Sequence, residues 1–402
     1  MKNNAHLHSK DLGGLTDILT DATLQITHVA EELSHQIVHP PFLPSTAIQG
    51  LISSIAGLAY QAVRLTTKAI SIGIKTALTE LDSPLLKLPK EEKEIALAIL
   101  NGIVGDYLAE QGNHLTIPMQ FRSQGIAISM DGAQIQQTIP AYNEKILIMV
   151  HGLCMNDLQW QFKGHNHGEA LAKEFGMTPL YLRYNSGRHI SENGETFNLL
   201  LAALVEHWPV KIEEIVILSH SMGGLVSRSA LHQAQEGSNN WPKLLKKLIF
   251  LATPHQGAPL ERIGNYIDRF LGAVPYFKPF ARLGKLRSSG ITDLRFSRLI
   301  KEDWVGRSRF DGNDQESTFI PLPTEIEAYA LAASINKAAD SFSANTLGDG
   351  LVQLKSALGQ HKIAERSLAI PKKNQYIAFE TNHLDILASL AVYEKLKSWL
   401  AD

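Results

Sequence analysis

Cysteine is almost absent from the sequence, because Cys154 is the only one among 402 residues. No internal disulfide can form, so the hydrophobic core alone must stabilise the fold, and a single thiol fits a reducing compartment. Long apolar segments are missing as well. Residues 1–14 lack the apolar region of a Sec-type signal peptide, and glutamines and serines make the uncharged stretch Pro40–Val63 a poor transmembrane span. We therefore expect a cytoplasmic protein.

Neither sign of charge is in excess. The formal net charge is −2, with 19% charged and 44% hydrophobic residues, which is ordinary globular composition. Such a chain lacks the basic footprint by which proteins bind nucleic-acid phosphates, so no nucleic-acid partner is expected. The length leaves room for two domains or one enlarged domain.

The pattern of apolar residues changes near residue 115. Before it, apolar residues recur every three or four positions, which predicts a helical N-terminal extension over residues 1–115. Over residues 116–402, short apolar runs alternate with helical patterns, which predicts an α/β domain with a mostly parallel sheet and helices on both faces. The interval 259–324 breaks this alternation and is too long for a simple connection, so we expect an inserted lid there. The expected strands are 146–150, 180–184, 215–218, 248–252, 329–333 and 376–379, and the expected helices include 90–110, 169–175, 196–208, 225–235 and 384–400.

One serine follows an expected strand in a pattern typical of a nucleophile. The strand 215–218 leads into Ser219-His220-Ser221-Met222-Gly223-Gly224, and a helical pattern follows. A sharp strand-to-helix turn crowds the backbone, so small residues are needed two positions before and after the serine. A similar pattern around Ser71 lies inside an amphipathic helical pattern with no strand before it. We therefore predict that Ser221 is the nucleophile.

Two backbone amides are predicted to stabilise the charge that develops when a serine attacks an acyl group. The strand 146–150 ends in His151-Gly152-Leu153, and such a loop supplies one N–H group of an oxyanion hole. The residue after the nucleophile supplies the other, next to a helix N-terminus that favours negative charge. The expected donors are the backbone N–H groups of Leu153 and Met222.

An aspartate and a histidine follow Ser221 in the order Ser, Asp, His that such a strand–turn–helix site uses. They are Asp349, between two glycines, and His383, in Asn382-His383-Leu384-Asp385. His383 would take the serine proton and return it to the leaving group, while Asp349 would fix the tautomer of the imidazole. Asp385 is a rival acid, although it lies only two residues from His383.

These pieces, together with Thr253-Pro254-His255-Gln256-Gly257, resemble the bacterial lipases of the α/β-hydrolase superfamily and the related GPI inositol-deacylase-like hydrolases. The resemblance covers about residues 140 to 402 and implies an α/β-hydrolase catalytic domain over 116–402. Ser219 departs from the glycine that is usual two positions before the nucleophile. Some lipases bind a structural calcium through an aspartate at the position of Asp385. Ser389 stands where an amide would be needed, so we assign no calcium, and the question stays open.

No metal and no cofactor is expected. The pairs His6/His8 and His165/His167 have no third ligand at a suitable spacing, so we interpret them as surface histidines. Cys154 has no local catalytic signature and is interpreted as a packing residue.

The sequence thus predicts a serine hydrolase that cleaves acyl or lipid esters through an acyl-enzyme on Ser221, either a lipase or a carboxylesterase. An acyltransferase or thioesterase stays open, because fold and triad do not fix the acyl acceptor. A non-catalytic binding module with a relict triad is the alternative of a different class.

A lipid surface is the further partner that we expect. Between residues 259 and 310, eleven Lys or Arg stand against five Asp or Glu, among aromatic and aliphatic residues. An apolar strip flanked by cations can enter the headgroup layer of an anionic membrane, which would make the protein peripheral to it. The alternative, in which the apolar residues cover the active site and the charges face water, stays open.

Overall fold

The structure, a computed structural model, describes residues 89–237, 239–273, 287–306, 317–337 and 348–401. These residues belong to one compact unit, formed by Pro89–Gly306 and Gln315–Asp402. Most of the predicted N-terminal extension and part of the predicted lid, including many of its basic residues, lie outside the described residues. No helix within the described ranges is long and apolar enough to cross a bilayer.

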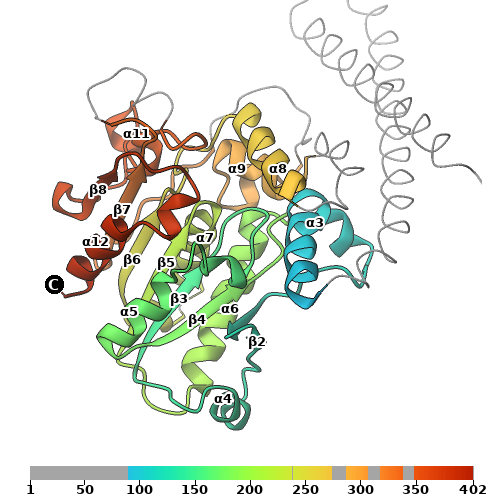
Figure 1. The fold of residues 1–402 in the computed structure, drawn as a ribbon, viewed down its shortest axis with the longest axis vertical. Coiled ribbons are helices and arrows are strands. Elements are labelled where there is room, and N and C mark those ends of the chain that lie inside the picture. Colours follow the sequence, from blue (N-terminus) through green and yellow to red (C-terminus); the bar gives the residue numbers. More distant parts are fainter. Residues whose placement is uncertain (1–88, 238, 274–286, 307–316, 338–347, 402) are drawn as a thin grey trace, which may run out of the picture. The chain divides into compact units, whose positions relative to one another are not determined.

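An eight-stranded sheet forms the centre of this unit, with the strand order β2-β1-β4-β3-β5-β6-β7-β8 (Figure 1). From β4 to β8 in this order all neighbours pair in parallel, and β1 pairs antiparallel with β4 and β2. The bounds are β1 Gln120–Ser123, β2 Ile126–Ala127, β3 Lys145–Val150, β4 Thr178–Arg183, β5 Glu214–His220, β6 Leu245–Leu251, β7 Glu327–Ala333 and β8 Gln375–Ala378.

The expected parallel sheet is therefore confirmed, and each expected strand overlaps one of β3 to β8. The inner strands β3, β5, β6 and β7 are buried on both faces over most of their length, whereas the edge strand β8 is mostly half-buried; β3, for example, is buried from Ile146 to Val150. Such strands have continuous apolar runs, which is why they are visible in the sequence. The antiparallel pair β1 and β2 was not expected from the sequence, because both strands are short and β2 is exposed.

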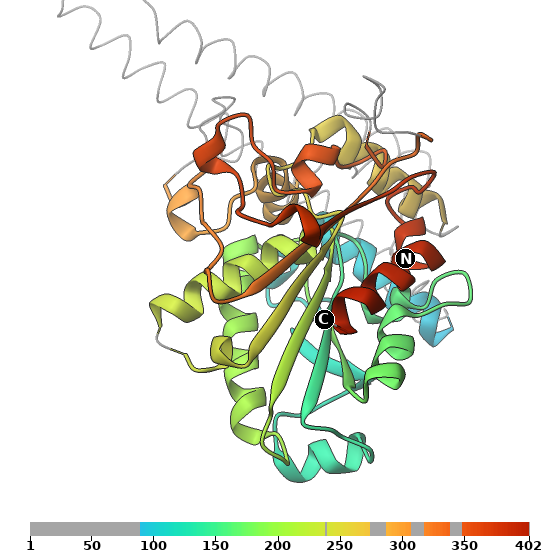
Figure 2. The ribbon, with the colours of Figure 1, turned by 90° about the vertical axis from the view of Figure 1, so that its left-hand side faces the viewer.

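Helices cover both faces of the sheet, as expected. The chain passes from β3 to β4 through helix α5 (His167–Phe175). It moves in the opposite direction along the sheet when it passes from β4 to β5 through α6 (Ile190–His207) and from β5 to β6 through α7 (Met222–Glu236). Right-handed crossovers place such helices on opposite faces. Figure 2 shows α5 and the C-terminal α12 (Leu390–Ala401) on one side, and α6 and α7 on the other. The short helix α4 (Gly132–Thr138) lies at the amino ends of the strands (Figure 1).

Helix α3 (Lys90–Glu110) is the described part of the predicted N-terminal extension, and it packs within the same compact unit as the sheet. The Glu94 carboxylate lies 2.7 Å from the Arg183 guanidinium on β4 and 3.2 Å from that of Arg122 on β1. The Asn101 side chain donates to the Leu115 carbonyl and accepts from the Ile117 amide. The domain boundary at residue 115 remains a prediction.

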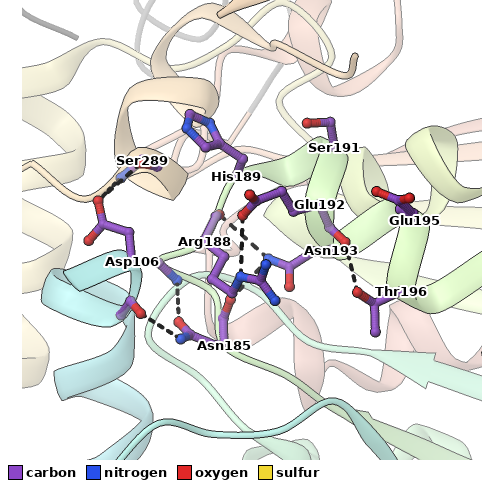
Figure 3. Close-up of polar contacts among 12 residues, drawn as sticks. Asp106, Asn185, Arg188, His189, Ser191, Glu192, Asn193, Glu195, Thr196 and Ser289 are labelled. Carbon is purple, nitrogen blue, oxygen red and sulfur yellow. Dashed lines mark hydrogen bonds and ion pairs between the residues drawn. The ribbon is translucent and has the colours of Figure 1, made fainter. Parts of the chain in front are cut away.

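Helices α8 (Leu260–Ala273), α9 (Ser289–Phe296) and α11 (Leu354–Ala357) lie beyond the carboxyl ends of the strands (Figure 1). Buried carboxylates fix α9 in place. Figure 3 shows Asp106 of α3 pointing at Ser289, whose backbone and hydroxyl both donate to it at 2.9 and 3.0 Å. Asp293 of α9 in turn accepts from the Ile190 amide at the first turn of α6. Negative charge at a helix N-terminus is stabilising, so α9 is anchored to both neighbours.

Candidate active site

Three side chains that the sequence singles out meet at the carboxyl ends of the strands. Ser221 follows β5, Asp349 lies in the loop after β7, and His383 lies after β8. The His383 Nε2 atom is 2.9 Å from Ser221 Oγ, and its Nδ1 atom is 2.6 Å from Asp349 Oδ2. All three residues are buried, and Ser221 is 0% exposed.

Ser221 occupies a strained backbone conformation between β5 and α7. Its φ of 54° lies in the left-handed region, which costs a non-glycine residue roughly 1–3 kcal/mol. The surrounding backbone maintains it, because the Ser221 amide donates to the Leu251 carbonyl at 2.8 Å and its carbonyl accepts from Gly224 at 3.0 Å. This turn directs the hydroxyl away from the sheet and toward His383.

Close contacts with neighbouring atoms explain two glycines of the site. A Cβ atom at Gly152 would lie 2.9 Å from Ser221 Cβ, and one at Gly223 would lie 2.5 Å from the Val150 carbonyl oxygen. Both distances are too short for real side chains. Ser219, in contrast, has space for its hydroxyl, which lies 2.8 Å from the Ser227 hydroxyl of α7. This bond accommodates the departure from glycine at position 219.

The acid beside the imidazole is Asp349. Its Oδ1 atom accepts from the Leu351 and Val352 amides at 2.9 and 2.7 Å, which leaves Oδ2 for His383. A carboxylate can only accept, so His383 carries its proton on Nδ1 and offers the Nε2 lone pair to Ser221. The rival Asp385 points elsewhere: its two oxygens lie 2.6 Å from Lys163 Nζ and 2.7 Å from Asn382 Nδ2.

The two predicted oxyanion donors belong to chain segments next to the serine. Leu153 follows β3, Met222 is the first residue of α7, and β3 and β5 are neighbours at the point where the strand order reverses. Such switch points are where parallel sheets bind ligands, and the first amides of a helix have no intrahelical partner. In the loop after β3, Cys154 has a φ of 60°. Its backbone amide donates to Ser186 Oγ at 3.0 Å and so helps to hold this loop in place.

The buried His151 has a structural role in this loop. Its Nδ1–H donates to the Gly152 carbonyl at 2.9 Å, and its Nε2 atom accepts from the Tyr184 amide at 3.3 Å. The Tyr184 ring stacks on it at 4.2 Å. Burial, with a smaller effect of Arg183, lowers the pKa of His151 to about 3, so the ring is neutral at physiological pH.

Tyr266 of α8 covers the imidazole, and it is a residue that sequence reasoning missed. The Tyr266 and His383 rings lie 5.4 Å apart, edge to face. Ile263 and Ile267 are buried on the same helix, whereas Asn265 and Asp268 are exposed. No signal in the sequence pairs residue 266 with residue 383. The apolar face of α8 does, however, lie in the interval where a lid was expected.

One member of the histidine pair His165/His167 is buried, although both were expected on the surface. His167 is 0% exposed; its Nδ1 atom lies 2.9 Å from His165 Nε2, and its Nε2–H donates to the Ile386 carbonyl. The prediction was wrong for His167, because the segment around Ile386 that buries it is more than two hundred positions away in the sequence. No group of three or more His, Cys, Asp or Glu that could hold a metal occurs among the described residues. His6 and His8 lie outside them.

Cys154 is fully buried, and its Sγ atom faces the Ile99 carbonyl of α3 at 3.9 Å. Burial strongly raises the pKa of its thiol, so it is not a thiolate at physiological pH. The packing role expected for it agrees with this environment.

Comparisons with known proteins give a family match and distant structural similarities. Residues 143–278 match the sequence profile of the PGAP1-like alpha/beta domain. None of the curated protein sequences matches the chain. The chain is similar to the mature form of a Bacillus licheniformis lipase, with 18% identity, a TM-score of 0.40, and 64% of this chain and 93% of the other covered.

Two further solved structures are an esterase of Pyrococcus furiosus and a hormone-sensitive lipase from a metagenome library. The first has 13% identity and a TM-score of 0.36, over 64% of this chain and 80% of the other. The second has 14% identity and a TM-score of 0.40, over 81% and 97%. With its topology, its strained serine turn and the profile match, the chain has the α/β-hydrolase fold and resembles the PGAP1-like alpha/beta domain over residues 143–278.

Proposed function

We propose that this protein is a serine hydrolase that cleaves carboxylic esters of acyl or lipid substrates. The observation that carries the proposal is the continuous chain of hydrogen bonds from Asp349 through His383 to Ser221. A serine, an imidazole and a buried carboxylate in this order are what acyl transfer requires. The match to the PGAP1-like alpha/beta domain supports an ester hydrolase at the family level.

The first half of the reaction forms an acyl-enzyme. Ser221 Oγ attacks the ester carbonyl while its proton passes to His383 Nε2. Asp349 stabilises the resulting imidazolium through the 2.6 Å contact with Nδ1. The negative oxygen of the tetrahedral intermediate accepts from the Leu153 and Met222 amides. The intermediate collapses when the C–O bond breaks and the leaving alcohol takes the proton from His383.

The second half returns the enzyme to its starting state. A water molecule gives its proton to His383 Nε2 and attacks the acyl carbon through the same oxyanion hole. The bond to Ser221 Oγ then breaks, the serine recovers its proton, and the carboxylic acid leaves. An alcohol or amine in place of this water would make the protein an acyltransferase, and a thioester substrate would make it a thioesterase.

Access to the site is proposed to involve a change at α8. Ser221 is 0% and His383 4% exposed, and Tyr266 lies against the imidazole. We propose that α8 acts as the cover, while α9 stays anchored through Asp106 and Asp293. Displacement of α8 would open the site and expose the face that carries Ile263, Tyr266 and Ile267.

A hydrolysis panel tests the proposal. Wild type, Ser221→Ala and Ser71→Ala are assayed on p-nitrophenyl esters of increasing chain length, on phospholipids and on acyl thioesters. We expect turnover of at least one ester class, a loss of roughly 10⁴ to 10⁶ in Ser221→Ala, and no loss in Ser71→Ala. Equal activity of wild type and Ser221→Ala would refute the proposal. Binding of the esters without turnover would favour a binding module.

A further inference from the structure

His220, the last residue of β5, occupies a central place in the site that the mechanism above does not use. It precedes Ser221 and is 0% exposed. Its ring lies 4.8 Å from the His383 ring and 6.4 Å from the Trp160 ring. The Nε2 atom of His220 lies 3.0 Å from the backbone carbonyl oxygen of His383. A carbonyl only accepts, so His220 carries a proton on Nε2.

The hydrogen bond from His220 is the second of two that hold the His383 backbone in place. The His383 amide donates to the Asp349 carbonyl at 3.2 Å, and the His383 carbonyl accepts from His220. Strand β8 ends at Ala378 and α12 begins at Leu390, so neither element includes His383. The segment also contains Glu380 in the left-handed region, with a φ of 52°. Hydrogen bonds to the His383 backbone therefore act together with the Asp349 side chain to fix the imidazole relative to Ser221.

The environment of His220 keeps its ring neutral. Its Nδ1 atom is buried and has no hydrogen-bond partner among the described residues. A proton there would be a buried donor without an acceptor, which is costly. Burial, followed by the effects of His383 and His151, holds the pKa of His220 well below its usual value. A positive charge 4.8 Å from the His383 ring would oppose the imidazolium that forms when Ser221 gives up its proton.

We propose that His220 is a positioning residue: its neutral ring donates from Nε2 to the His383 carbonyl and thereby fixes the imidazole against Ser221 without adding charge. The inference rests on the proposed function, because His383 is the group that it positions. The sequence gives no sign of this role, since the two residues are 163 positions apart.

A pair of variants of similar size separates the hydrogen bond from packing. His220→Gln places an amide N–H near the position of Nε2, whereas His220→Met fills a similar volume with no donor. The ester that wild type cleaves best is the substrate, and circular dichroism and thermal melts establish that each variant is folded. We expect His220→Met to lower kcat by roughly 10- to 100-fold with KM nearly unchanged, because a small misplacement of a catalytic group has such an effect. His220→Gln should recover activity to within about threefold of wild type.

A purely structural role predicts something else, namely equal losses in both variants that follow their melting temperatures. That result, or a His220→Met variant with wild-type kcat, would overturn the inference. If His220→Met does not fold, the comparison of His220→Gln with wild type decides, since a loss above about tenfold in the folded Gln variant contradicts a role carried by one N–H donor.

A measurement that needs no activity distinguishes failure of this inference from failure of the proposed function. Imidazole ¹⁵N chemical shifts are recorded for the Ser221→Ala protein from about pH 5 to pH 8. We expect His220 to remain neutral with its proton on Nε2 throughout this range. A proton on Nδ1, or titration of the ring within this range, would overturn the inference even if ester hydrolysis is established.

Discussion

The Nε2 atom of His383 lies 2.9 Å from the Oγ atom of Ser221, although the two residues are 162 positions apart. The strained turn after β5 and the loop after β8 bring them together. Hydrogen bonds to the backbone of each residue fix its position. The Ser221 amide donates to the Leu251 carbonyl, the His383 amide donates to the Asp349 carbonyl, and the His383 carbonyl accepts from the His220 side chain. The proposed reaction would therefore start from a geometry that the fold already holds, as electrostatic preorganisation requires.

Replacement of the acid is expected to separate Asp349 from Asp385. Asp349→Asn should lower kcat by roughly 10⁴, because an amide can stabilise the wrong tautomer of His383 and cannot balance its charge. Asp385→Asn is the matched control, since its carboxylate contacts Lys163 and Asn382 instead of the imidazole. We expect it to stay within about tenfold of wild type in steady-state ester hydrolysis. The reverse order of the two variants would show that the acid is wrongly assigned.

A methyl group at position 152 is expected to damage catalysis. The new Cβ would lie 2.9 Å from Ser221 Cβ, so Gly152→Ala must displace the serine turn or the Leu153 amide. Loss of one oxyanion donor lowers kcat by roughly 10²- to 10³-fold, and we expect a loss of this order. Gly264→Ala serves as the control, because nothing lies within 4 Å of its Cβ position. If both variants are equally active, the close contact at Gly152 does not control the positions of the serine and the Leu153 amide.

Buried neutral histidines are expected to make the fold sensitive to acid. Burial, with a smaller effect of His165, lowers the pKa of His167 to about 4. Below about pH 6.5 the unfolded chain binds a proton at this position that the folded chain does not, so the free energy of unfolding falls as pH decreases to about 4. The loss from His167 is on the order of 3 kcal/mol. His151, whose pKa is about 3, adds to it in the same direction.

Urea unfolding between pH 7 and pH 4.5 measures this effect. His167→Gln should show a smaller decrease of the unfolding free energy with pH than wild type. His207→Gln, at an exposed position of α6, should keep the wild-type slope. Parallel slopes for wild type and His167→Gln would mean that His167 is not buried in the neutral form.

Contact with a lipid surface is expected to depend on charge. We propose that the basic residues between 259 and 310 and the apolar face of α8 together favour anionic over zwitterionic vesicles. Co-sedimentation at low salt should therefore be stronger with anionic vesicles and weaker at high salt. The double variant Arg282→Glu/Lys285→Glu should bind less, and Lys211→Glu, at an exposed position elsewhere, should bind as wild type. Equal, salt-insensitive binding to both vesicle types would remove the electrostatic part of this proposal.

Local sequence pattern predicts the parallel sheet well, because β3 and β5 are continuous apolar runs that are buried on both faces. The same local pattern misplaces the ends of helices where contacts with residues distant in the sequence determine them. Helix α6 begins at Ile190, six positions earlier than expected, because Asp293 accepts from the Ile190 amide. The last helix begins at Leu390, later than expected, because the Asn382 side chain accepts from the Leu384 and Asp385 amides and forms a turn there.

The site shows the same division between local and distant signals. Ser221 stands in a local strand–turn–helix pattern, so one window of sequence indicates it. The choice between Asp349 and Asp385 depends on which carboxylate faces the imidazole, which only the folded loops determine. The contacts of His220 and Tyr266 with His383 likewise join distant segments, and no spacing rule indicates them. The catalytic roles of these residues remain predictions for experiment.

Covalent labelling identifies the nucleophilic serine without a known substrate. The protein is treated with a fluorophosphonate probe, digested, and the modified peptide is identified by mass spectrometry. We expect that one phosphonyl group is added, on Ser221. Asp349→Asn should slow the labelling strongly, and Ser221→Ala should abolish it while Ser71→Ala does not. Labelling of another serine, or no labelling of folded wild type under conditions that label a known serine esterase, would contradict the assignment of Ser221 as the nucleophile.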